Sequence, residues 1–121
     1  MKQLRKSSTV LFSVLITIIF LSCRPNYDRV TVIKMLESSN PDSILQGCRF
    51  VLDSKDTTYI DFLLKKPYQY KVTFDLRYKG MNGYQGKMQA LETLSGIKSP
   101  IKITSDVDSS VANFYHKVLK R

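Results

Sequence analysis

The sequence predicts an all-α domain that follows an export signal. Apolar residues recur at helical spacing in several segments, and helix-capping residues precede those segments. Only residues 68–78 alternate apolar and polar positions as a β-strand does, and no strand of similar quality stands nearby. An isolated strand is not stable. We therefore expect helical hairpins, a C-terminal helix and an extended segment near 68–78, with an α+β fold as the alternative.

Residues 1–22 have the layout of a secretory signal. Lys2, Arg5 and Lys6 form a short positive region, and residues 10–22 (VLFSVLITIIFLS) form an apolar core of 13 residues. This core is too short to cross about 30 Å of hydrocarbon comfortably as a helix. A positive start, an apolar middle and a small residue before a cleavage point are typical of exported proteins. An uncut signal anchor is the alternative.

The residue that follows this segment is a cysteine. Phe20-Leu21-Ser22-Cys23 resembles the lipobox of bacterial lipoproteins, in which apolar residues and a small residue precede the cysteine that becomes the new N-terminus. The resemblance implies that Cys23 carries diacylglycerol and that residues 23–25 form a lipidated tether. It also implies a membrane-anchored protein of the bacterial cell envelope. Arg24 follows Cys23, which leaves the outer membrane as the expected destination where the host has one.

The mature chain, residues 23–121, has the size of one domain, and we place that domain at residues 26–121. The formal net charge of the whole chain is +9, and three of the basic residues lie in the signal, which leaves +6. Because the charges are scattered, they fit a solvated basic surface, an anionic membrane or an acidic protein partner. Export argues against a nucleic-acid partner. The second cysteine, Cys48, is expected to be a small buried hydrophobe.

The first two helices are expected at about residues 29–38 and 41–52. Asn26 or Asp28 caps the first, whose apolar face is Val30, Ile33, Met35 and Leu36. Asn40 caps the second, and Pro41 and Asp42 suit its first turn. Its apolar stripe is Ile44, Leu45, Cys48, Val51 and Leu52. Residues 53–56 are expected to form a tight connection.

The third helix is expected to begin after Asp56 or Thr57 and to end before Pro67. It carries Tyr59, Ile60, Phe62, Leu63 and Leu64. Residues 68–78 then form an extended connection that packs its aromatic side chains on the helices. Residues 97–104 are the only candidate partner strand, and that pairing would make the fold α+β.

Two further helices are expected in the last third of the chain. Asn82 caps the first, which carries Tyr84, Met88, Leu91 and Leu94 on one face and ends at Gly96. Gly86 within it indicates a close contact between helices. Asp108 or Ser109 caps the final helix, whose stripe is Val111, Phe114, Tyr115, Val118 and Leu119. The core is expected to include Leu45, Cys48, Leu52, Leu63 and Leu91.

The first half of this pattern resembles a HEAT-like helical repeat. The matching residues are Leu36-x3-Asn40-Pro41-Asp42-x-Ile44-x3-Cys48-x3-Leu52 and then Asp56-x3-Ile60-x2-Leu63-Leu64. Residues 87–96 are similar to the end of a second repeat, and residues 106–119 to a terminal helix. Two features depart from that family: residues 68–78 interrupt the second copy, and a stable array usually needs at least about three repeats. An unrelated small helical bundle is the alternative.

No arrangement of residues points to catalysis. His116 is the only histidine and has no acidic residue at helical spacing, so we expect it at the surface. Asp53, Asp56 and Asp61 gather around a turn, but helix capping explains the first two better than calcium does. No zinc spacing, phosphate loop or nucleophile elbow occurs. We expect a non-enzymatic protein with neither metal nor cofactor.

The best candidate surface is the basic, tyrosine-rich stretch from residue 65 to residue 87. Tyrosine and arginine are favoured at protein interfaces. Its predicted partner-binding residues are Lys65, Lys66, Tyr68, Tyr70, Arg77, Tyr78, Lys79 and Tyr84, with Lys71 and Lys87 among them in sequence. We expect a lipid-anchored adaptor that binds another protein. An inhibitor or immunity-type protein and an accessory subunit of an envelope enzyme complex are the alternatives, and the partner and the oligomeric state stay open.

Overall fold

The computed structural model describes residues 26–119. The predicted signal (residues 1–22), Cys23 and the tether (residues 23–25) lie outside the described residues. The described chain contains five α-helices: α2 (Arg29–Glu37), α3 (Pro41–Ser54), α4 (Ile60–Leu64), α5 (Gly83–Ser95) and α6 (Ser109–Leu119). It contains no strand, so the all-α prediction is confirmed. None of these helices has the length and apolar character needed to cross a membrane.

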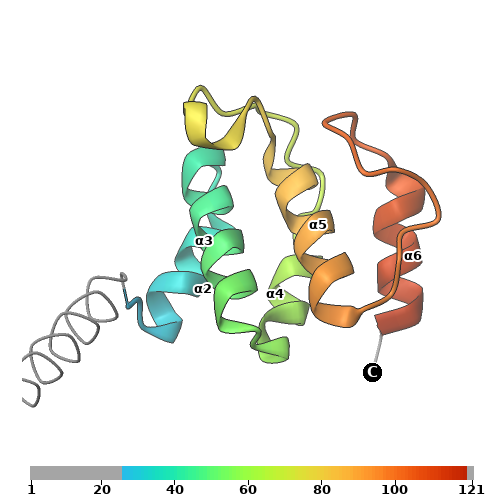
Figure 1. The fold of residues 1–121 in the computed structure, drawn as a ribbon, viewed down its shortest axis with the longest axis horizontal. Helices are drawn as coiled ribbons and strands as arrows, with labels where there is room; N and C mark the ends of the chain where they lie inside the picture. The colour runs from blue at the N-terminus through green and yellow to red at the C-terminus, as the bar shows by residue number, and fades with distance from the viewer. Residues whose placement is uncertain (1–25, 120–121) are drawn as a thin grey trace, which may run out of the picture.

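The helices form two hairpins and a closing helix (Figure 1). Helix α2 packs on α3, and α4 packs on α5. The two hairpins lie side by side, because α3 contacts α5 and α2 contacts α4. Helix α6 packs against both α4 and α5. Helices α3, α5 and α6 all begin at the same end of the molecule, so that end collects their N-termini.

Most of the helices begin at the capping residues that the sequence predicts. Asp28, Asn40 and Asn82 accept hydrogen bonds from the backbone N–H groups of Thr31, Asp42 and Gln85, at 2.9, 2.9 and 2.8 Å. Asp56 caps a 3-10 turn, η1 (Thr57–Tyr59), that leads into a short α4. Gly96 ends α5 with a φ of 70°. The predicted connection at residues 53–56 is wrong in part, because α3 continues through Ser54 and Lys55 closes it in the left-handed conformation.

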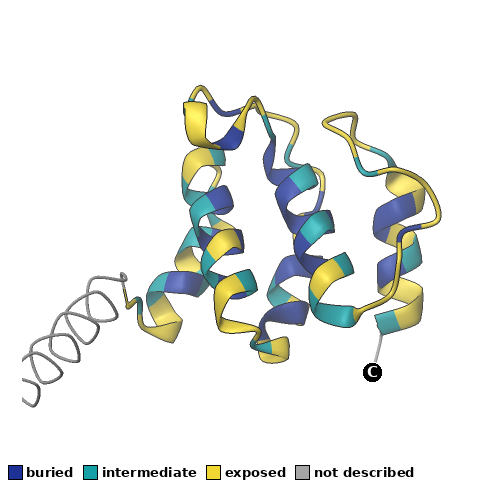
Figure 2. Ribbon diagram, viewed as in Figure 1, coloured by how far each residue is buried: buried dark blue, intermediate teal, exposed yellow. Residues whose placement is uncertain are grey.

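The core lies between the helices, as the inward faces in Figure 2 show. Leu45, Cys48, Leu63 and Leu91 are buried as predicted, whereas Leu52 is only partly buried. The predicted face of the first helix is wrong in part: Leu36 is buried and Ile33 packs against the core as predicted, but Val30 does not. Val32 and Leu36 are buried and Val30 is exposed, because α2 presents one row of residues four apart to α3.

Two helical glycines allow the helices to approach closely. A Cβ at Gly86 of α5 would lie 2.5 Å from Leu45 Cδ2 of α3, which confirms the predicted close contact at this glycine. A Cβ at Gly47 would lie 2.9 Å from Met35 Cβ of α2. Both distances are shorter than van der Waals contact allows. The helices can therefore approach this closely only because residues 47 and 86 are glycines without a Cβ.

The connection after α4 is extended, as predicted, but it packs differently. Its strand-like pairing is limited to one isolated antiparallel bridge between Val72 and Asn82. The alternative, a pairing of this stretch with residues 97–104, is not observed, because Asn82, just before α5, takes that place. A 3-10 turn, η2 (Leu76–Tyr78), ends the connection. The prediction that its aromatic side chains cover the core is wrong for Tyr70 and Phe74, which are exposed.

Candidate functional site

The described residues bring together few groups with the chemistry of catalysis. Between residues 26 and 119, no three side chains of the His, Cys, Asp and Glu types gather closely enough to hold a metal ion. Cys48 is buried, and burial raises the pKa of its thiol to about 12, so the thiol stays neutral near pH 7. His116 is exposed on α6, and its Nε2 lies 3.0 Å from the carbonyl oxygen of Leu64.

The eight predicted partner-binding residues do not form one surface. Tyr84 is buried and its hydroxyl donates to the carbonyl oxygen of Asp108, at 3.3 Å, so it belongs to the core. Tyr78 is also buried. Lys65 lies beside α2, where its Nζ is 3.9 Å from a Glu37 carboxylate oxygen, and it lines a hollow against α6. The remaining exposed residues are Lys66, Tyr68, Tyr70, Arg77 and Lys79.

Residues 70–76, which we call the tip segment, cross the end of the molecule where α3 and α5 begin (Figure 1). Two backbone hydrogen bonds fix the segment against the residues that precede and open α5. Tyr84 donates its N–H to the Gln69 carbonyl oxygen at 2.9 Å, and Thr73 donates its N–H to the Met81 carbonyl oxygen at 2.9 Å. The Thr73 hydroxyl also donates to the Asp42 carboxylate in the first turn of α3. Thr73 is buried, so a polar side chain attaches the segment to the helices.

The apolar side chains of the tip segment point to solvent. Phe74 is 95% exposed, Leu76 92% and Tyr70 72%. Val72 stands between them and is 46% exposed. Large apolar side chains that stand alone at a protein surface are ordinary, whereas a continuous row of them marks an interaction site. The alternation therefore has the opposite orientation from the one predicted: its apolar face is outside.

Basic residues alternate with these apolar residues or stand close to them in the sequence. Lys66, Lys71 and Lys79 are exposed, and Lys66 and Lys79 adopt the left-handed conformation with φ of 46° and 49°. Arg77 is paired with Asp75, with 2.7 Å between Nη2 and Oδ2. The hydrogen bonds and charge of Arg77 lower the pKa of Asp75 below its ordinary value. Asp42, in the first turn of α3, accepts from Thr73. Asp42 and Asp75 are thus engaged, and the exposed Lys71 gives the α3 side of the segment a positive character, whereas Asp106 and Asp108 lie on the α6 side of the same end.

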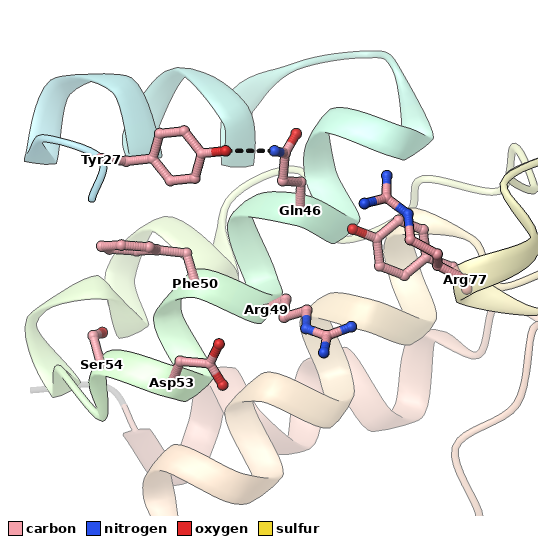
Figure 3. Close-up of a pocket in the computed structure, with 8 residues that line it drawn as sticks. Tyr27, Gln46, Arg49, Phe50, Asp53, Ser54 and Arg77 are labelled. Atoms are coloured by element: carbon pink, nitrogen blue, oxygen red, sulfur yellow. Dashed lines mark hydrogen bonds between the residues drawn. The ribbon is translucent and has the colours of Figure 1, made fainter. Parts of the chain in front are cut away.

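A shallow pocket of about 720 Å³ adjoins this end along the outer side of α3 (Figure 3). Tyr27 and Phe50 form one side of it, with their rings 5.6 Å apart edge to face. Gln46 donates to the Tyr27 hydroxyl at 2.6 Å, and Arg77 closes the opposite side. Arg49 lies between them. Asp53 also lines the pocket, so its charged residues are two arginines and one aspartate.

The sequence did not predict Val72, Phe74 and Leu76 as site residues. Strict alternation shows that two faces differ, but it does not show which one meets the core. The signal that distinguishes them is Thr73, a polar residue whose hydroxyl finds a carboxylate partner at Asp42. That contact joins residues 31 positions apart, which periodicity alone does not relate.

No protein-family model matches the chain, and neither a curated protein nor a solved structure shows significant similarity to it. Function must therefore be inferred from the residues of the chain and their geometry.

Proposed function

We propose that this chain is a lipid-anchored protein of the bacterial cell envelope that acts by binding another protein, without catalysis. One observation carries the proposal: the tip segment exposes large apolar side chains, with Phe74 at 95% and Leu76 at 92% exposure, next to the exposed Lys71. Exposed aromatic and aliphatic side chains with a charged rim have the composition of a protein interface. The net positive charge of the chain favours an acidic partner.

The arrangement of the helices supports an adaptor by analogy. The α2–α3 and α4–α5 hairpins lie side by side, and α6 covers the second of them. Stacked hairpins of this kind are what the HEAT-like pattern in the sequence implies, and such arrays commonly bind proteins. Fold-level analogy alone is a weak guide to function, so the tip segment is the stronger support.

The anchor is tested by metabolic labelling with a fatty-acid analogue. We expect the wild-type chain to be labelled and Cys23→Ala to lose the label, because the thioether forms only on that sulfur. Cys48→Ala is the matched control: its thiol is buried in the described domain and should not affect labelling. Equal labelling of wild type and Cys23→Ala would contradict a lipid on Cys23.

Partner binding is tested by capture from envelope fractions with the full-length chain. We expect the combined change Lys66→Asn, Lys71→Gln and Lys79→Asn to weaken capture strongly at low salt and only slightly at high salt, because exposed charges are screened. Asparagine suits residues 66 and 79, since it tolerates the left-handed conformation.

The matched control is Lys34→Gln, Lys98→Gln and Lys102→Gln, which removes the same charge from exposed positions away from the tip segment. We expect this control to retain the partner at both salt concentrations. Equal capture by the two triple variants at low salt would exclude the tip segment as the binding surface. Loss of the captured protein's activity on binding would identify the chain as an inhibitor.

A further inference from the structure

We propose that the outer edge of residues 70–74 accepts an extended, acidic segment of the bound protein as an added β-strand. This inference rests on the proposed function, because it specifies how the tip segment recognises its partner. Strand addition uses backbone hydrogen bonds for affinity and alternate side chains for specificity. The tip segment offers backbone hydrogen-bonding groups and alternate apolar side chains, and no other described residue pairs with its outer edge.

The backbone of the segment has one used edge and one open edge. The carbonyl of Gln69 and the N–H of Thr73 point inward to Tyr84 and Met81. In an antiparallel pair, successive residues alternate between the two edges. Tyr70, Val72 and Phe74 therefore direct their N–H and C=O groups outward. No described residue forms a backbone hydrogen bond with any of these three.

The same three residues carry the exposed apolar row. Tyr70, Val72 and Phe74 share one side of the extended backbone, because side chains alternate with a period of two. An exposed strand edge with apolar side chains is a template for pairing with another chain, which proteins usually block with charge, proline or a covering element. Residues 68–82 contain no proline, so every backbone N–H of the edge is present.

A groove next to the edge gives an added strand a place for a side chain. This groove, of about 430 Å³, lies between the start of α3 at Asn40–Asp42 and the residues Lys71, Val72 and Phe74. Its mixed lining suits an aliphatic or small polar side chain. The added strand would thus contact the apolar row on one side and α3 on the other.

Charge selects the kind of strand. On the α3 side of the edge, Lys71 lines the groove, and the carboxylates of Asp42 and Asp75 already accept hydrogen bonds from Thr73 and Arg77. The exposed Asp106 lies on the other side, where the neighbouring Ser105 accepts from Asn82, so the positive side of the edge is the one that faces α3. An acidic strand therefore meets positive potential. A second copy of this chain brings the same lysine and is repelled. A membrane offers no partners for open N–H and C=O groups in its hydrocarbon layer, so the open edge favours a peptide over lipid.

The experiment uses the full chain in nanodiscs of neutral lipid and a labelled peptide of alternating glutamate and valine, about eight residues long. Binding is measured by fluorescence anisotropy, and backbone N–H exchange is followed by NMR. We expect the N–H of Val72 to exchange rapidly in the free protein and slowly in the complex. The Thr73 N–H is already hydrogen-bonded and serves as the internal reference.

The peptide itself provides the sharpest comparison. N-methylation of alternate residues on one edge removes hydrogen-bond donors and keeps every side chain and charge. We expect this peptide to bind at least about tenfold more weakly. Equal binding of the methylated and unmethylated peptides would overturn strand addition and indicate simple electrostatic adsorption.

Substitutions in the protein, instead of in the peptide, test the same edge. Val72→Pro removes one outward N–H, and Phe74→Ser removes the most exposed apolar side chain. Each change should lower the affinity for the peptide at least about tenfold. Val30→Ser, which changes an exposed valine on α2, should bind as wild type does. The methylated peptide gives the same comparison without altering the fold, should Val72→Pro unfold.

Three further outcomes separate this inference from the proposed function. Capture that depends on the tip lysines, together with no peptide binding or protection of Val72, would overturn strand addition and leave the adaptor role intact. Binding to phosphatidylglycerol vesicles that is lost in Phe74→Ser, with no peptide binding, would overturn strand addition in favour of a membrane contact. Capture that is unaffected by the tip residues would exclude the tip segment as the binding surface, and failure to capture any envelope protein would overturn the proposed function itself.

Discussion

Leu91→Ala is expected to destabilise the domain by roughly 2–5 kcal/mol. Leu91 is fully buried in the middle of α5, the helix that contacts α3, α4 and α6. Truncation removes apolar surface that is buried on folding and leaves a cavity among three helices that cannot all move inward. A domain of this size is typically stable by about 5–15 kcal/mol, so this one change consumes much of the total.

The loss is measured by urea unfolding followed by circular dichroism. We expect the midpoint to fall while the dependence of the unfolding free energy on urea stays the same, as a change in native stability requires. Leu52→Ala is the matched control, because it removes the same atoms from a leucine that is only partly buried. We expect about 1 kcal/mol there. Equal losses at the two positions would show that α5 does not occupy the centre of the core.

Signals within a few residues of one another in the sequence were sufficient to predict the helices. Asn40 and Asn82 have side chains that accept from N–H groups two or three residues away, so the cap and its helix are encoded within one turn. The stripe containing Ile44, Cys48 and Val51 predicted which face of α3 is buried, and all three are buried. Such features depend on neighbours in sequence, which is why they were predictable.

The site depends on contacts that are distant in sequence, and for this reason most of it was missed. The alternating stretch was correctly predicted to be extended, but its orientation is set by the Thr73–Asp42 contact and by two backbone hydrogen bonds, one from Tyr84 to Gln69 and one from Thr73 to Met81. Tyr84 was predicted both on the apolar face of its helix and as a partner-binding residue, and only the first holds: it is buried, and its hydroxyl donates to the Asp108 carbonyl oxygen. Composition identified the region, and tertiary contacts decided which side chains it exposes.

Lys87 is the clearest case of a side chain whose burial the sequence pattern did not predict. The sequence groups it with the surface lysines, yet its side chain is fully buried in α5. Its Nζ donates to the carbonyl oxygens of Lys65 and Lys66, at 2.9 and 3.3 Å. Those carbonyls follow the end of α4, where backbone oxygens lack partners in the helix and a positive charge is favourable. Lys87 therefore binds the C-terminal end of α4 to α5.

Lys87→Glu is expected to destabilise the domain by more than about 3 kcal/mol, because a buried carboxylate would face two carbonyl oxygens with no hydrogen to donate. Lys87→Met is the matched control: it keeps the length of the side chain, removes the charge and also removes its desolvation cost. We expect it to lie within about 2 kcal/mol of wild type. A Glu variant as stable as the Met variant would show that residue 87 reaches water.

The pH dependence of stability provides a second measurement of the same burial. Desolvation lowers the pKa of Lys87 in the folded protein below its unfolded value of about 10.4. Between those two values the unfolded chain binds more protons, so stability attributable to this group rises with pH. The free energy of unfolding of wild type relative to Lys87→Met should therefore increase as the pH approaches about 10.4. Both proteins should carry Cys48→Ala, because burial raises the pKa of the Cys48 thiol, Lys87 lowers it, and removal of Lys87 would change that titration too. A difference that stays constant with pH would mean that the ammonium is solvated.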